Sequence, residues 1–159
     1  MFCFILNKKS VSKLIMITKL TWKFLVQFNY KNPPKICLGR SPEVTKQYND
    51  HKQKLINDSI DINTYISNKY FSKSNQTLFI EYNAFPYNCA ENIKHYVMWI
   101  NLKDNHIKDK FLTEFKLYIC NTLFNGDESK MDDNCVYYQN IPEQRSIKGI
   151  PHLQIFVRT

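Results

Sequence analysis

The sequence predicts an α+β fold, in which a mostly antiparallel sheet of about four strands packs against helices. Three observations support this prediction. Apolar residues recur at helical spacing in some segments, they alternate along others, and hairpin-length connections join the strand-like segments. The 159 residues include 43% hydrophobic side chains, three glycines and six prolines, without an internal repeat, so we expect one domain with one core.

Two helices are expected in the first third of the chain. Residues 20–28 form a short apolar segment that predicts the first. Residues 41–56 predict the second, because Ser41 suits the N-cap, Pro42 suits the first helical position, and apolar side chains follow at helical spacing. Arg40 directly precedes this helix and is expected to brace its start against an acidic group or a carbonyl.

Two more helices are expected, at residues 61–71 and 106–124. The apolar stripe predicted for the second consists of Ile107, Phe111, Leu112, Phe115, Tyr118, Ile119 and Thr122. Asn125 and Gly126 follow this helix and suit its C-terminal end. Four strands complete the fold, at residues 77–82, 94–100, 134–139 and 152–158.

The beginning of the chain is expected to lie outside the folded domain. The apolar run at residues 1–6 is too short for a signal peptide or a membrane span, and lysines follow it. Met16 is a candidate start beside Met1. We therefore expect residues 1–15 to be a flexible extension and residues 16–159 to form a single α+β domain.

The charge of the protein is high but diffuse. The formal net charge is +8, from 22 Lys and Arg against 14 Asp and Glu. The lysines are spread along the whole chain, and arginines occur only at positions 40, 145 and 158, whereas nucleic-acid readers more often cluster arginine on one element. We therefore expect no specific nucleic-acid binding. Lys, Asn, Ile and Tyr are abundant and have AT-rich codons, as expected in a large DNA virus or an AT-rich protist.

Five cysteines stand at positions 3, 37, 89, 120 and 135. Their number is odd and no CxxC pair occurs, so the sequence predicts neither a disulfide framework nor a zinc site. A reducing, cytoplasmic location fits this pattern, and we expect no metal and no cofactor. No stretch of the sequence is long and apolar enough to predict a membrane association.

The candidate site lies on the last predicted strand, which reads "HLQIFVR". Its alternation directs Leu153, Ile155 and Val157 toward the core and directs His152 and Gln154 to the opposite face. Two interpretations of that face stay open. The polar side chains are either solvated or capping a loop, as on many antiparallel sheets, or they line a shallow ligand pocket.

The loop before this strand adds three candidate ligand-binding residues. Arg145 and Lys148 supply positive charge and Ser146 supplies a hydroxyl donor, which together suit a phosphate or a carboxylate. His95, on another predicted strand, is interpreted first as a hydrogen-bonded, partly buried residue. It joins the site if its strand lies next to that of His152.

Five segments follow one another in the order "LTWKFL", "LGRSPEVTKQYNDHKQKL", "INTYISNKYF", "FPYNCAENIKHYVMWIN" and "YYQNIPEQRSIKGIPHLQIFVR". Together they resemble the fungal N-acetylglucosamine-induced protein family, a domain of unknown function, over about residues 20–158. The family name records induction by a sugar and implies no reaction. Where the family carries a His-x-His pair near the end of the chain, this sequence has His152-Leu153-Gln154.

The segment "NIPEQRSIKGIPHLQIFV" also resembles, more remotely, the closing segment of histidine-triad nucleotide hydrolases and transferases. That chemistry needs an imidazole that attacks phosphorus. In one register Gln154 replaces the nucleophile, and in the other Ile150 replaces the first histidine while His152 is the candidate catalytic residue. Either way the triad is incomplete, so the resemblance implies a histidine-triad-like fold more than an activity.

Two classes of function remain open. The first is the binding of a small anionic ligand, a nucleotide or a sugar phosphate, on the face of His152 and Gln154 without strong catalysis. The second is a non-catalytic interaction protein that holds a protein or RNA partner through its basic surface. The sequence does not decide whether the protein is an enzyme, and it indicates no oligomeric state.

Overall fold

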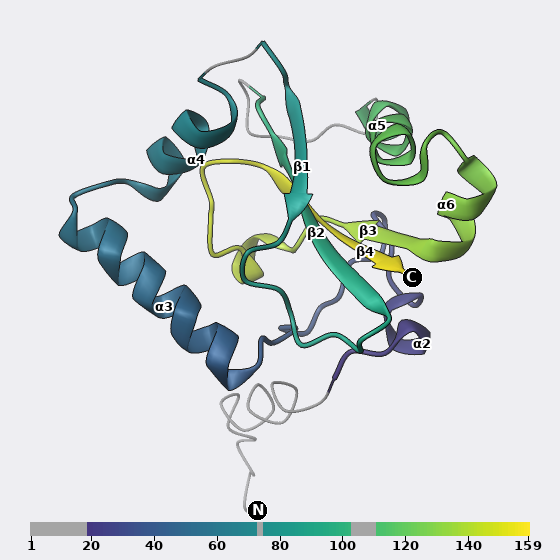
Figure 1. Ribbon diagram of the computed structural model, residues 1–159, viewed down its shortest axis with the longest axis horizontal. Helices are drawn as coiled ribbons and strands as arrows, with labels where there is room; N and C mark the ends of the chain where they lie inside the picture. The colour runs from purple at the N-terminus through teal and green to yellow at the C-terminus, as the bar shows by residue number, and fades with distance from the viewer. Residues whose placement is uncertain (1–18, 73–74, 103–110) are drawn as a thin grey trace, which may run out of the picture.

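The computed structural model describes residues 19–72, 75–102 and 111–159, whose strands form one antiparallel sheet (Figure 1). The strands are β1 (Leu78–Tyr82), β2 (Ile93–Ile100), β3 (Cys135–Tyr138) and β4 (His152–Arg158), in the order β1-β2-β4-β3. β4 pairs with β2 on one side and with β3 on the other, so the strand that carries the candidate site is central. The predicted α+β class with a four-stranded, antiparallel sheet is confirmed.

One face of the sheet packs against two helices, α5 (Leu112–Phe124) and α6 (Glu128–Asn134), which lie together on one side of the sheet in Figure 1. The buried side chains between sheet and helices are Leu78, Met98, Ile100, Phe115, Ile119, Cys120, Phe124, Met131, Leu153, Ile155 and Val157. Three residues predicted for the core, Leu153, Ile155 and Val157, are among them. Burial of this apolar area is the main source of stability.

The opposite face of the sheet is also covered, so of the interpretations left open, that of a solvated face is wrong. The helices α2 (Trp22–Leu25) and α4 (Ile62–Tyr70) and the chain around Ile150 pack on it. His152 and Gln154 are therefore only 6% and 5% exposed. The alternation along β4 was predicted correctly, but the second layer comes from segments whose packing it cannot reveal.

The helix caps follow the sequence signals. The helix α3 (Pro42–Asn57) begins after Ser41, whose Oγ accepts a hydrogen bond from the Val44 N–H at 3.2 Å. Only Leu55 of this helix is buried, and α3 stands at the rim of the molecule in Figure 1. The left-handed conformation of Asn125 ends α5 as predicted, with φ 54°.

Other boundaries differ from the prediction. The helix expected at 20–28 is reduced to the four residues of α2. The stripe predicted for α5 is partly wrong: Thr122 is exposed, and the buried side runs through Cys120 and Phe124 instead. α6 was not predicted, nor was the short 3-10 turn η2 (Pro142–Gln144).

The expected flexible extension, residues 1–15, lies outside the described residues, as does the first part of the helix expected at 106–124. Within the described part, Cys37, Cys89, Cys120 and Cys135 are free thiols. No helix among the described residues has the length and apolar character that crossing a membrane requires.

Candidate functional site

A cavity of about 310 Å³ lies over the polar face of the sheet, between α3, α4 and two loops. This volume is in the range of small-ligand sites. Its wall includes Glu81, Val97, Trp99, His152 and Gln154 from the strands, Tyr48, His51, Tyr65, Lys69 and Tyr70 from the helices, and Arg40, Asn83, Phe85, Tyr87, Asn140, Gln144, Ser146 and Ile147 from the connecting segments. A more open groove of about 520 Å³ beside β3 contains none of the predicted site residues.

A chain of hydrogen bonds fixes the floor of this cavity. The Tyr87 N–H donates to His95 Nδ1 at 2.9 Å, so the ring proton must sit on Nε2, which donates to Gln154 Oε1 at 2.8 Å. The amide Nδ2 of Asn83, 3.4 Å from the same Nε2, is a second donor and makes no bond there. Burial, assisted by the charge of Arg40, lowers the pKa of His95 to about 3. His95 is therefore neutral, and it orients Gln154.

The hydrogen bond from His95 fixes the orientation of the Gln154 amide, because the N–H of the ring requires the amide oxygen Oε1 as its acceptor. The amide nitrogen Nε2 has no hydrogen-bond partner among the described residues, and Gln154 lines the cavity. The side chain therefore offers the cavity a donor with a defined orientation.

His152 offers the opposite polarity. Its Nδ1–H donates to the carbonyl of Ile150 at 2.9 Å, which leaves the lone pair of Nε2 without a partner in the described chain. The ring contacts Trp99, with 5.0 Å between the centroids. Burial lowers the pKa of His152, and the charge of Arg145 adds to this effect. The neutral imidazole can accept a hydrogen bond or a proton, but it is a weak base.

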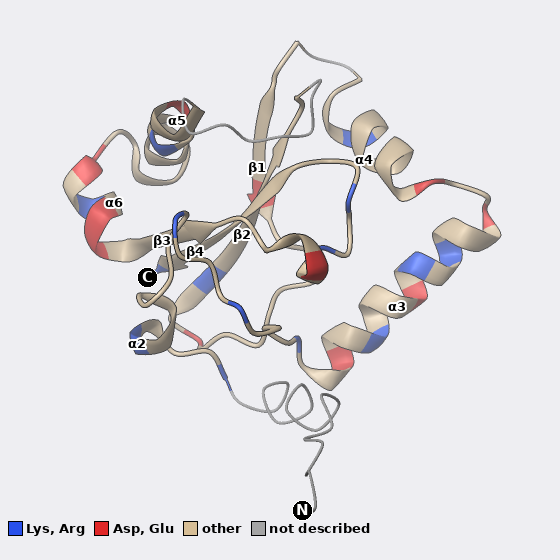
Figure 2. Cartoon of the chain, turned by 180° about the vertical axis from the view of Figure 1, so that it is seen from behind, with Lys and Arg blue, Asp and Glu red and all other residues tan. Residues whose placement is uncertain are grey.

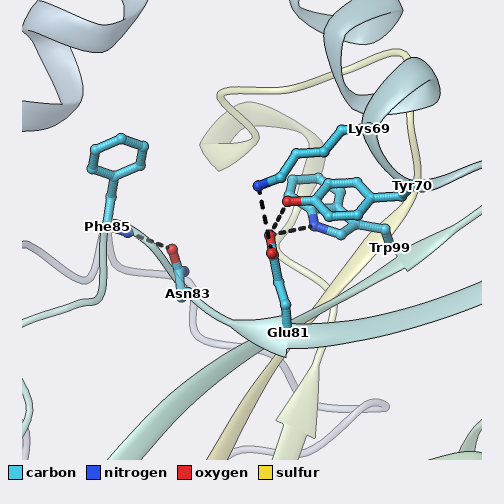
Figure 3. A network of polar contacts seen from close by, with 6 residues as sticks. All are labelled: Lys69, Tyr70, Glu81, Asn83, Phe85 and Trp99. Atoms are coloured by element: carbon cyan, nitrogen blue, oxygen red, sulfur yellow. Dashed lines mark hydrogen bonds and ion pairs between the residues drawn. The ribbon is translucent and has the colours of Figure 1, made fainter.

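An acidic group occupies another part of the wall (Figure 3). Glu81 accepts hydrogen bonds from the Tyr70 hydroxyl and, at 3.3 Å, from Trp99 Nε1, and it forms an ion pair of 3.5 Å with Lys69. Burial raises the pKa of Tyr70, and the bond to Glu81 raises it further. This network joins α4 to β1 and β2.

Arg40 provides a cation of the wall. Its Nε donates to the carbonyl of Phe85 at 2.9 Å, and the guanidinium lies 4.2 Å from the ring centroid of Tyr48 and 5.5 Å from that of Tyr87. The expected bracing against a carbonyl is confirmed. The two terminal nitrogens have no carboxylate or carbonyl partner in the described part of the chain, so they are available to a ligand.

The predicted loop residues differ in their placement. Ser146 lines the cavity, whereas Arg145 and Lys148 do not. Arg145 is half-buried and its Nε donates to the carbonyl of Asn140 at 2.7 Å, while Lys148 is exposed. Arg145 acts on the site through its charge, which reaches His152.

A close approach between two segments holds this loop in place. The Gly149 N–H donates to Asn63 Oδ1 of α4 at 3.2 Å, and a Cβ on Gly149 would lie only 2.5 Å from that oxygen. The loop that carries Ser146 is therefore fixed against the helix that forms the opposite wall.

Of the six predicted ligand-binding residues, the structure brings Ser146, His152 and Gln154 to the cavity and places His95 behind Gln154. β2 and β4 are neighbours, as the interpretation of His95 required, but His95 pairs with Phe156 and therefore meets Gln154 rather than His152. Sequence reasoning missed Arg40, Glu81 and Lys69 as wall residues, along with the surrounding aromatic rings. The acidic residue within an alternating strand was the one signal available, for Glu81.

In the part of the chain that the structure describes, no cluster of three or more His, Cys, Asp or Glu side chains could hold a metal ion.

Comparisons with known proteins support the fold and the family. A solved structure titled "Crystal Structure of HTC1" resembles this chain with a TM-score of 0.56 and 21% sequence identity, over 77% of this chain and 76% of that one. At this identity the likeness shows the fold alone. No curated protein sequence matches the chain significantly. A family model described as "Protein of unknown function (DUF3605)" matches residues 4–158, and the chain therefore belongs to the DUF3605 family.

Proposed function

We propose that this protein binds a small anionic ligand, a nucleotide or a sugar phosphate, in the cavity above β4, without strong catalysis. The observation that carries this proposal is Arg40: a half-buried guanidinium on the cavity wall, held by Phe85 and Tyr48, whose terminal nitrogens have no partner in the described chain. Charge-assisted bonds from arginine are the strong polar contacts available to a phosphate or a carboxylate.

The electrostatics of the floor agree with an anionic ligand. Arg40 and Arg145 act on the two buried histidines in the same direction, since each lowers the pKa of the nearer imidazole. The histidines remain neutral, so the positive potential at the floor comes from the arginines alone. Ser146 adds a hydroxyl donor to the wall.

The same features favour binding over turnover. His152 lines the cavity and is the candidate catalytic residue, but its lowered pKa makes it a poor proton acceptor. Gln154 occupies the place of a second histidine and cannot attack phosphorus. The remote resemblance to histidine-triad proteins therefore supports a ligand face of that kind more than its chemistry. We include in this proposal the cytoplasmic location expected from the cysteine pattern.

The test compares two arginines that each donate a hydrogen bond through Nε and contact an aromatic ring. Nucleotides and sugar phosphates are screened by thermal shift, and the best ligand is titrated by calorimetry against wild type, Arg40→Met and Arg158→Met. Arg158 is the matched control, because it is exposed outside the cavity, donates to Asn134 at 3.1 Å and lies 5.1 Å from the ring centroid of Trp22.

We expect Arg40→Met to weaken binding about tenfold or more, because it removes a charge-assisted contact. Arg158→Met is expected to bind as wild type does. Equal affinities in Arg40→Met and wild type, at similar melting temperatures, would contradict the proposal.

A further inference from the structure

We infer that the cavity selects a compact polyhydroxylated anion, of the class of sugar phosphates, over a nucleotide. This inference rests on the proposed function and concerns the part of the ligand that does not contact Arg40. It follows from the polarity of the floor, from the packing of the aromatic rings in the wall, and from the position of Glu81.

The floor presents one donor and one acceptor. Gln154 Nε2 is a donor because His95 holds its Oε1, and His152 Nε2 is an acceptor because its Nδ1–H is held by the Ile150 carbonyl. The two residues stand two apart on one face of β4, about 7 Å between their Cα atoms. A hydroxyl group both donates and accepts, so a ligand with several hydroxyls can satisfy both positions in more than one orientation.

The aromatic rings of the wall are already paired. Tyr70 stacks on Trp99, with 5.9 Å between centroids and 17° between planes. Tyr70 also contacts Phe79, with 4.8 Å between the ring centroids. Trp99 also contacts His152. A nucleobase gains much of its affinity by stacking on an aromatic face, and Tyr70 and Trp99 already stack on each other.

Aromatic rings on the cationic side of the wall contact Arg40 and one another. Arg40 lies over the Tyr48 ring, which meets Phe85 edge-on at 5.4 Å. The Tyr87 ring contacts His95, with 4.7 Å between the centroids, and Phe156, with 6.2 Å. The aromatic residues therefore limit the shape of the cavity, while its polar atoms supply the specific contacts.

Glu81 sets the orientation of such a ligand. Its carboxylate lies in the same cavity wall as Arg40 but belongs to the network of Lys69, Tyr70 and Trp99. An anionic group is attracted by Arg40 and repelled by Glu81, whereas a hydroxyl can donate to a carboxylate. A ligand with one anionic end and one hydroxyl-bearing end fits both groups.

The test uses ribose 5-phosphate and adenosine monophosphate, which differ by the base, together with glucose 6-phosphate, glucose and inorganic phosphate. Each is titrated by calorimetry into the full chain. We expect at least one of the two sugar phosphates to bind at least tenfold more tightly than adenosine monophosphate, glucose and inorganic phosphate. This comparison needs no variant and so does not depend on the folding of a mutant.

A second arm replaces the donor on the floor. Gln154→Glu keeps an oxygen for His95 and removes the amide donor, and it is expected to weaken the sugar phosphate tenfold or more. Gln53→Glu makes the same change on the exposed side of α3, where Gln53 bonds to Asn57 at 2.9 Å, and is expected to leave binding unchanged.

The outcomes separate this inference from the proposed function. Binding of adenosine monophosphate that equals or exceeds that of both sugar phosphates overturns the inference and leaves an anion-binding cavity. Unchanged affinity in folded Gln154→Glu also overturns it. If none of the phosphate-bearing probes binds, both the inference and the proposed function fail.

Discussion

His95 illustrates how burial and two hydrogen bonds define the chemical state of one side chain. It is 0% exposed, between the Tyr87 N–H and Gln154 Oε1, and its ring stacks on Phe156 at 4.4 Å. The folded protein therefore holds the neutral form, with a pKa lowered to about 3, while the unfolded chain has the ordinary value of 6.5. Protonation of His95 therefore favours the unfolded chain over the folded protein.

This effect predicts the direction of the pH dependence of stability. Between pH 6.5 and about 3 the unfolded chain binds a proton at residue 95 that the folded protein excludes, so the free energy of unfolding falls as the solution is acidified. For one such group the loss is about 2 kcal/mol between pH 7 and pH 5. Urea unfolding of wild type and His95→Gln at both pH values measures it. We expect a shallower profile in the variant, and parallel profiles would contradict the prediction.

Sequence reasoning reached the identity of the polar residues on β4 but not their chemical state. The alternation of "HLQIFVR" places His152 and Gln154 on one face, since side chains alternate along a strand. Which ring nitrogen of His95 and of His152 carries the proton depends on the hydrogen-bond partners. For His95 one partner is Tyr87, eight residues away. These pairings follow from loop geometry, which no periodicity reports. The position of Arg40 in the cavity wall was missed for the same reason.

The helix α4 is attached to the sheet by a polar network as well as by apolar packing. Glu81 of β1 accepts from Tyr70 of α4 and from Trp99 of β2, and the three side chains converge in Figure 3. Removal of a shared acceptor leaves buried donors without partners, which costs about 1–3 kcal/mol for each group. The network therefore fixes α4 over the cavity.

We predict that Glu81→Ala lowers the free energy of unfolding by about 1–3 kcal/mol, whereas Glu81→Gln lowers it less because the amide oxygen still accepts from Tyr70 and Trp99. Chemical unfolding measures both. Glu91→Ala is the control, because Glu91 is 95% exposed and pairs only with Lys19 among the described residues, an interaction worth about 0–1 kcal/mol. Equal losses in Glu81→Ala and Glu91→Ala would show that the network contributes little to stability.

Helices and strands were predicted correctly where the sequence has a helix-capping residue or a regular spacing of apolar side chains. α3 and the end of α5 were predicted from Ser41 and Asn125, and all four strands were found. α6 was missed because its seven residues bury only Met131, so it has no apolar stripe. The order of the strands could not be predicted, because it depends on long-range pairing between β2 and β4.

The whole molecule is a layered sheet with charge dispersed over its surface. Figure 2 shows Lys and Arg on helices and loops, with acidic residues interleaved along α3. The three apolar clusters of the described chain consist of residues from Leu20 onward. The family match begins earlier, at residue 4.

We predict that a chain beginning at Met16 folds as stably as the full chain, because residues from Leu20 onward supply these clusters and all strands of the sheet. Thermal unfolding of the two chains under identical conditions tests this. A melting temperature lower by more than about 5 °C in the shorter chain would show that the preceding residues pack on the domain.

The position of β4 in the chain has a consequence for how the protein is made. β4 follows every other described element, yet it lies between β2 and β3 and carries the cavity floor. Its Gln154 meets a partner 59 residues earlier. Until His152–Arg158 has been synthesised, β2 and β3 each have an unpaired edge, and such edges invite pairing with other chains. A product truncated before β4 therefore lacks both the floor of the cavity and the strand that connects β2 to β3.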